Sequence, residues 1–96
     1  MTKRATTKEI TNAGRLGESA QGKDGWSEIP IIGYDLKVIY FRFPTRDGIA
    51  AHIIEVSSGE RIASRTLSGE LNAPKLLHCL QAWVTQTLRD RKSAGM

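Results

Sequence analysis

The chain has little of what builds a metal centre or a disulfide framework. It contains one cysteine, Cys79, and two histidines, His52 and His78. A single cysteine excludes an intramolecular disulfide, and a structural zinc site needs four closely spaced ligands, usually cysteine and histidine. We therefore expect no cofactor and no metal site made by one chain.

Long apolar runs are also absent. No segment approaches the ~20 consecutive apolar residues that cross a bilayer, and the basic segment Met1 to Lys8 lacks the apolar stretch of a signal peptide. The 96 residues, 40% hydrophobic and 25% charged, are typical of one small globular domain. We expect a cytoplasmic protein without membrane contact.

Acidic residues are outnumbered by basic ones, and the excess of basic residues lies at the two ends. Residues 1–25 carry five basic and three acidic side chains, residues 26–70 five and six, and residues 71–96 four and one. The net charges are therefore +2, −1 and +3, which sum to +4. Proteins that bind nucleic acid concentrate Lys and Arg on the recognition surface. The net charge is thus compatible with a polyanionic partner but does not require one.

The first 25 residues contain few apolar side chains. Ile10 and Leu16 are the sizeable ones, and four glycines would each weaken a helix by ~1 kcal/mol relative to alanine. We predict a flexible basic arm over residues 1–25 and a single small domain over residues 26–96.

Three runs rich in β-branched and aromatic residues follow: Tyr34–Phe43, Ile49–Val56 and Arg61–Leu67. Asp47-Gly48 and Ser58-Gly59 separate them and supply the positive φ angles that tight hairpins need. The third run is short and polar, which suits an edge strand. Before them, residues 28–33 are apolar, but Pro30 confines that segment to an edge strand, a bulge or a covering piece.

A long amphipathic helix is expected after the strands. Asn72 is a good N-cap, and Pro74 is tolerated in the first turn. One stripe of the helix is apolar, and basic residues near its end suit the helix dipole. The stripe consists of Ala73, Leu76, Leu77, Leu80, Trp83, Val84, Thr87 and Leu88. The fold class is therefore α+β: an antiparallel meander of three strands, or four with an extra edge strand, packed against one C-terminal helix.

The order of these elements resembles that of small DNA-binding domains in plant transcription factors and phage integrases. The resemblance covers the order alone, from Tyr34 onward, and carries over no functional residue.

The central strand is apolar on both of its faces. Alternation places Tyr34, Leu36, Val38, Tyr40 and Arg42 on one face and Asp35, Lys37, Ile39, Phe41 and Phe43 on the other. Such a strand is covered on both sides or lies at an interface. Because one helix covers one face, we expect either residues 26–32 or another molecule to cover the second.

Catalysis is not expected. His78 and Cys79 are adjacent on the helix and point about 100° apart, so they cannot face each other. His52 lies on a strand between apolar residues, where a histidine is more often packed than catalytic.

Nucleic-acid binding is one candidate function. Arg61, Ala63 and Arg65 are expected on one face of the third strand, where arginines could read a groove. In a single-strand mode, aromatic side chains would stack on bases. The residues expected to contact nucleic acid are Arg42, Arg46, Arg61 and Arg65, with Lys3, Arg4 and Lys8 assisting.

The sequence favours a small non-catalytic binding protein, dimeric, acting through the open sheet face, with nucleic acid as a further ligand. A self-paired dimer is the commonest way to cover such a face. The alternative is a regulator or inhibitor that binds only protein. The residues expected at the partner or dimer interface are Tyr34, Tyr40, Phe41 and Phe43.

Overall fold

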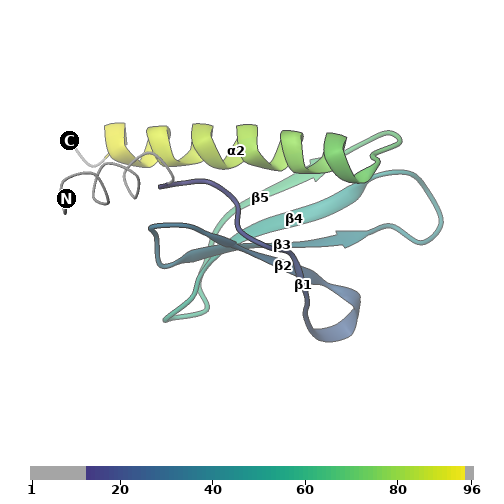
Figure 1. The fold of residues 1–96 in the computed structure, drawn as a ribbon, viewed down its shortest axis with the longest axis horizontal. Coiled ribbons are helices and arrows are strands. Elements are labelled where there is room, and N and C mark those ends of the chain that lie inside the picture. Colours follow the sequence, from purple (N-terminus) through teal and green to yellow (C-terminus); the bar gives the residue numbers. More distant parts are fainter. Residues whose placement is uncertain (1–12, 95–96) are drawn as a thin grey trace, which may run out of the picture.

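A computed structural model describes residues 13–94. Five strands form one antiparallel sheet in the order β1-β2-β3-β4-β5, and one long helix lies across one side of it (Figure 1). The elements are β1 (Ala20–Gln21), the short 3₁₀ helix η1 (Lys23–Gly25), β2 (Ser27–Ile31), β3 (Leu36–Arg42), β4 (Ile49–Glu55), β5 (Arg61–Leu67) and α2 (Ala73–Ala94). The α+β class is confirmed, with more strands than expected.

The strands after residue 34 form for the local reasons that the sequence indicates. Gly48 and Gly59 both adopt positive φ in the two hairpin turns. β5 lies at the edge of the sheet, as its polar character predicts. Along β3 and β4, buried residues alternate with half-buried ones. This two-residue period is expected of a strand that packs one of its faces against a core.

Strand β2 lies inside the sheet rather than over it. Ser27–Ile31 pairs along its length with β3, so the expectation that residues 26–32 as a segment cover the second face is wrong. The prediction of an extra strand here is confirmed, but β2 is not at the edge of the sheet, because β1 pairs with its other side. Pro30 turns its carbonyl away from β3 and accepts a bond from Gly17 N at 2.8 Å. Its missing N–H therefore points to the outer side of β2, where proline is tolerated.

Residues 13–25, expected to form part of a flexible arm, run beside β2. Gly14 N donates to Ile32 O at 2.7 Å, and Ile32 N donates to Arg15 O at 2.9 Å. These backbone bonds, with the short strand β1, give the glycine-rich segment a defined place in the sheet. The arm predicted for residues 1–12 lies outside the described residues.

Helix α2 packs on one face of the sheet and encloses the core. Asn72 Oδ1 accepts from Lys75 N at 3.0 Å, which confirms the predicted N-cap. Leu76, Leu80, Trp83 and Val84 are buried, whereas Leu77, expected in the same stripe, is 42% exposed.

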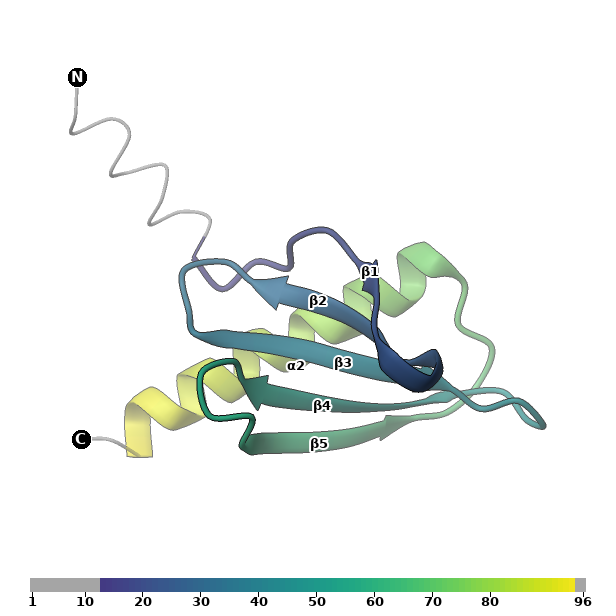
Figure 2. The same ribbon diagram turned by 90° about the horizontal axis from the view of Figure 1, so that it is seen from below.

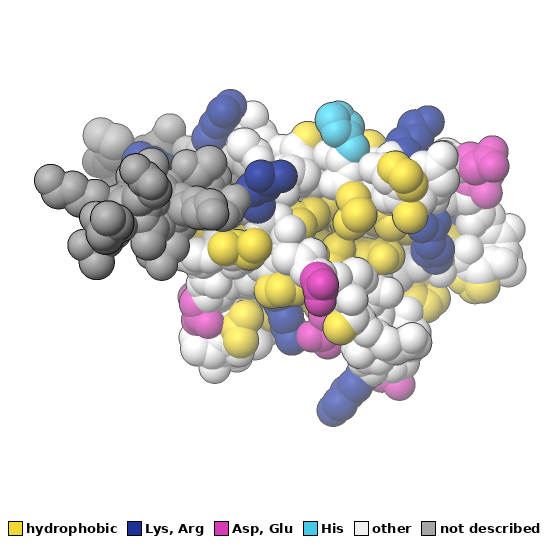
Figure 3. Space-filling model, viewed as in Figure 1, with side chains coloured by type: hydrophobic (Ala, Val, Ile, Leu, Met, Phe, Trp, Pro, Cys, Tyr) yellow, Lys and Arg dark blue, Asp and Glu magenta, His cyan; other side chains and the backbone are white. Residues whose placement is uncertain are grey.

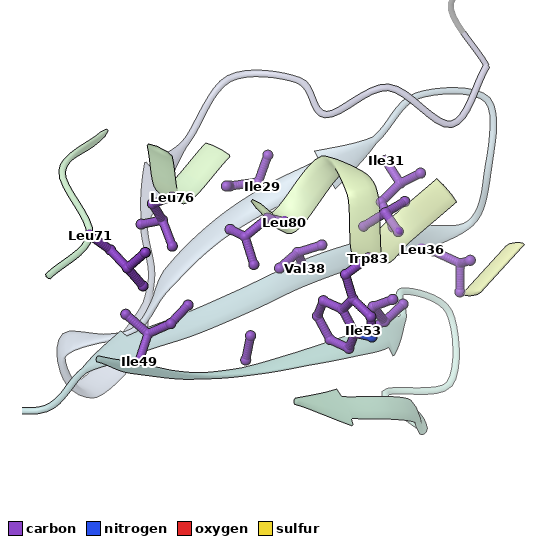
Figure 4. Packing of buried hydrophobic residues seen from close by; sticks show 12 residues of the cluster. Ile29, Ile31, Leu36, Val38, Ile49, Ile53, Leu71, Leu76, Leu80 and Trp83 are labelled. Carbon is purple, nitrogen blue, oxygen red and sulfur yellow. The ribbon is translucent and has the colours of Figure 1, made fainter. Parts of the chain in front are cut away.

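Apolar side chains from both layers interdigitate in this core (Figure 4), and Figure 3 shows hydrophobic side chains gathered between helix and sheet. The sheet contributes Ile29, Ile31, Leu36, Val38, Ile49, Ala51 and Ile53. Full burial of each large aliphatic side chain contributes about 1.5–3 kcal/mol. The helix side of the sheet is thus the hydrophobic core, and the other side of the sheet is left without a helix over it.

Candidate binding surface

We call the side of the sheet opposite α2 the open face; Figure 2 views the sheet from this side, with the helix behind the strands. Strand pairing aligns its side chains in rows. One row runs from Glu28 through Ile39 and His52 to Ser64, and the next contains Lys37, Ile54 and Arg61. Ile39, Phe41, His52 and Ile54 are half-buried, although no second layer of the described residues lies over them.

Trp26 covers the centre of the open face. Its ring lies 5.5 Å from the Phe41 ring, centroid to centroid, at 38°. The same ring stacks on the His52 imidazole at 5.4 Å and 28°. Trp26 precedes β2 and thus reaches across β3 to β4. Such aromatic pairs contribute about 0.5–1.5 kcal/mol each beyond the area they bury. We call Trp26, Phe41 and His52 the aromatic cluster.

A shallow hollow of about 340 Å³ borders the cluster on the β2 side. It is lined by Lys23, Asp24, Trp26, Glu28, Lys37 and Ile39. Across it Lys37 Nζ donates to Glu28 Oε1 at 3.0 Å, with both side chains about one-third exposed. A pair this exposed contributes little to stability. Its effect is to pair two opposite charges that border the cluster on this side.

His52 is held at the middle of β4 by its neighbours. Its Nδ1 lies 2.8 Å from Ser64 Oγ on β5, a hydrogen-bond distance. Burial, together with the nearby Arg61 guanidinium, lowers the pKa of the imidazole below its ordinary value of 6.5. The ring is therefore neutral at pH 7, so the cluster presents an uncharged aromatic surface.

Arg61 and Arg65, expected on one face of their strand, lie on opposite faces. The β4–β5 register shifts between Ile53 and Ile54, so Ile53 pairs with Ala63 but Ile54 pairs with Arg61. This bulge adds one residue to β5 and reverses the alternation. Arg61 therefore reaches the open face, while Arg65 lies on the helix side beside Trp83.

The other arginines expected to bind nucleic acid are engaged elsewhere. Arg42 Nη1 donates to Leu71 O at 2.8 Å, in the segment that leads into the helix. The Arg46 guanidinium lies 4.3 Å above the Phe43 ring, a cation–π contact in the β3–β4 turn. The four arginines thus do not converge on one surface. Lys3, Arg4 and Lys8 lie outside the described residues.

The four aromatic residues expected at an interface are also dispersed. Tyr34 is 47% exposed in the β2–β3 turn, and Tyr40 packs against the core on the helix side. Phe43 lies under the Arg46 guanidinium. Among these four aromatic residues, Phe41 is the one that belongs to the aromatic cluster. The sequence analysis missed Trp26 and His52 as partners of Phe41. Alternation along β3 and β4 could have placed Phe41 and His52 on one face, but not Trp26.

Within residues 13–94, no three His, Cys, Asp or Glu side chains are grouped so that they could hold a metal ion. In the same part of the chain, no helix is both long enough and apolar enough to span a membrane.

Comparisons with protein-family models, with curated proteins and with solved structures found no match to this chain.

Proposed function

We propose that the protein is a small non-catalytic binding protein and that its open face docks on the open face of a second copy. The observation that carries the proposal is the aromatic cluster at the centre of a sheet face that, within residues 13–94, no second layer covers. Two such faces would pack as a sandwich, with sheets ~10 Å apart.

The charges around the cluster favour a second copy over a polyanion. They are Lys23, Asp24, Glu28, Lys37 and Arg61. Three basic and two acidic side chains leave a net charge of +1, so two open faces repel each other only weakly. A polyanion binds through basic side chains that neutralise its phosphates, and a net charge of +1 provides few of these on this surface.

The size of the face indicates a weak dimer. β3, β4 and β5 have seven residues each. With the five residues of β2, at ~3.3 Å per residue and ~4.8 Å between strands, they give a flat footprint of roughly 410 Å². Standard interfaces bury about 800 Å² of accessible surface on each partner. Side chains project from the sheet, so the solvent-accessible area of the face is larger than this flat footprint. The area that each copy could bury still lies near the lower end of the areas buried in stable interfaces.

Self-association can be tested by sedimentation equilibrium from low to high micromolar protein. We expect the wild type to dimerise and Ile39→Ser to weaken the dimer by on the order of tenfold or more, because each copy loses apolar area at the interface. Leu77→Ser is the matched control, since Leu77 is exposed on the helix, away from the open face. A strict monomer at high micromolar concentration, or equal effects of the two variants, would contradict the proposal.

Single-stranded nucleic acid is a second candidate ligand of the same face, favoured by the position of Arg61 beside an aromatic cluster. Bases would stack on Trp26 while Arg61 contacts phosphate. Titration with an oligonucleotide, followed by Trp fluorescence, tests this. Saturable quenching that Arg61→Ala abolishes supports nucleic-acid binding, and quenching that ignores this substitution contradicts it.

A different protein could take the place of the second copy, and a wild type that stays monomeric would direct attention to such a partner. Cytoplasmic location is part of the proposal.

A further inference from the structure

His52 lies where any molecule docked on the open face must cover it. It occupies the middle of β4, between Ile39 on β3 and Ser64 on β5. Trp26 stacks on one side of its ring, and Ser64 Oγ lies 2.8 Å from its Nδ1. The imidazole is thus a titratable group within the aromatic cluster and near the centre of the face.

The charged groups around His52 come from three strands and from η1. Arg61 on β5 acts on its charge. Lys37 on β3 lies one row away and is bonded to Glu28, which shares the row of His52 but belongs to β2. Lys23 and Asp24 of η1 line the hollow beside Trp26. His52 Nδ1 lies at hydrogen-bond distance from the Ser64 hydroxyl, and Glu28, the carboxylate in its row, is bonded to Lys37. A charged imidazole would therefore have a cation beside it and no carboxylate bonded to it.

We propose that protonation of His52 separates the two docked copies, so that the open face associates at neutral pH and releases in acid. This inference rests on the proposed function, because it concerns the same surface. A protonated His52 next to Arg61 places two like charges in each copy, and therefore four in a symmetric interface. Docking would therefore cost free energy in two ways, because these charges lose their hydration and because they repel each other.

The direction of the effect follows from proton linkage. Burial and Arg61 already hold the pKa of His52 below 6.5 in the single chain. Docking removes more water from the ring and brings a second Arg61 near, which lowers that pKa further. The dimer therefore binds fewer protons than two separate copies. Its dissociation constant rises as pH falls, by at most about tenfold per pH unit for each histidine.

Acid also acts on the fold of each copy. The folded chain binds a proton at His52 less readily than the unfolded chain does. This contribution to stability is present above the unfolded pKa and is lost as pH falls through it toward the folded pKa. Circular dichroism at each pH is therefore needed to separate dissociation from unfolding.

The test compares sedimentation equilibrium at pH about 7.5 and about 5.5, on either side of the ordinary pKa of histidine. We expect wild type to dissociate in acid. His52→Gln loses the ring that stacks on Trp26, so its dimer should be weaker than that of wild type, but because glutamine stays neutral its dissociation constant should be the same at both values. His78→Gln is the matched control, because His78 is the chain's other histidine and is exposed on the helix. It should behave as wild type.

His52→Lys tests the same idea without acid, since its charge is permanent near neutral pH. We expect it to be folded and monomeric at pH about 7.5. A wild-type dimer whose affinity does not change with pH, or a His52→Gln dimer that is lost in acid as wild type is, overturns the switch and leaves the proposed function standing. A wild type that is monomeric at neutral pH overturns both.

Discussion

Gln81 holds the segment before β1 against the helix with both ends of its amide. Its Oε1 accepts from Leu16 N at 2.9 Å, and its Nε2 donates to Gly14 O at 2.9 Å. The partners lie more than 60 positions away in the sequence. One side chain on α2 thus satisfies two backbone groups at the outer edge of the sheet, which explains how a glycine-rich segment becomes ordered there.

Replacing Gln81 by alanine should destabilise the fold by about 1–3 kcal/mol, because a half-buried N–H and C=O lose their partner. Gln86→Ala is the control, since Gln86 bonds to Asp90 on the exposed side of the same helix. Its effect should stay within about 0.5 kcal/mol. Urea unfolding measures both variants, and equal losses would show that the Gln81 contacts do not hold the segment.

At the scale of elements, the two hairpin turns use glycine for different reasons. Gly48 has φ +119°, and a Cβ there would lie 2.5 Å from Leu67 O on the neighbouring strand. Gly59 has φ +75°, with nothing within 4 Å of an added Cβ. The first turn therefore needs glycine for both conformation and space, and the second needs it for conformation alone.

Gly59→Ala should consequently cost about 1 kcal/mol, the usual penalty of a left-handed conformation for a residue with a Cβ. Gly48→Ala should cost about 3 kcal/mol, because it adds a backbone collision to the strain. Thermal unfolding of the two variants at neutral pH tests the order. If Gly59→Ala proved the more damaging, our account of the turns would be wrong.

The β4–β5 bulge decides on which side of the sheet each arginine of β5 lies, and the proposed function depends on this. Simple alternation along Arg61–Leu67 puts both arginines of the strand together. The register shift between Ile53 and Ile54 instead brings Arg61 to the open face beside His52 and leaves Arg65 on the helix side. The charge that the proposed acid switch depends on is thus positioned by an irregularity of the sheet.

At the scale of the whole molecule, the two sides of the sheet differ in burial. The helix side is enclosed, while the open face carries half-buried apolar residues. Under the proposed function, neighbouring residues of one strand therefore act in stability and in binding respectively. Ile53 and Ile54 are the clearest pair, since Ile53 is 1% exposed in the core and Ile54 lies half-buried on the open face.

Ile53→Ala should reduce the free energy of unfolding by about 2–5 kcal/mol, as removal of a core isoleucine does. Ile54→Ala should change the stability of the single chain by less than about 1.5 kcal/mol and act mainly on dimer affinity. Unfolding at low protein concentration measures the first effect, and sedimentation at high concentration measures the second. Similar stability losses in both variants would contradict the division between the two faces.

The sequence by itself determined the elements from Leu36 to the end of the helix. Alternation, the glycines of the turns, the Asn72 cap and the apolar stripe are local signals, and they act within a few residues of where they stand. They predicted β3, β4 and β5 to within two residues at each end, and the α+β class with them.

Only the tertiary structure decided which side chains meet. The place of residues 13–31 in the sheet depends on backbone bonds to a distant strand and on Gln81. The contact of Trp26 with His52 spans three strands, and the bulge that divides Arg61 from Arg65 arises from pairing between β4 and β5. Pairing between distant segments leaves little trace in local residue patterns, so the position of Trp26 and the separation of Arg61 from Arg65 could not be predicted from the chain alone.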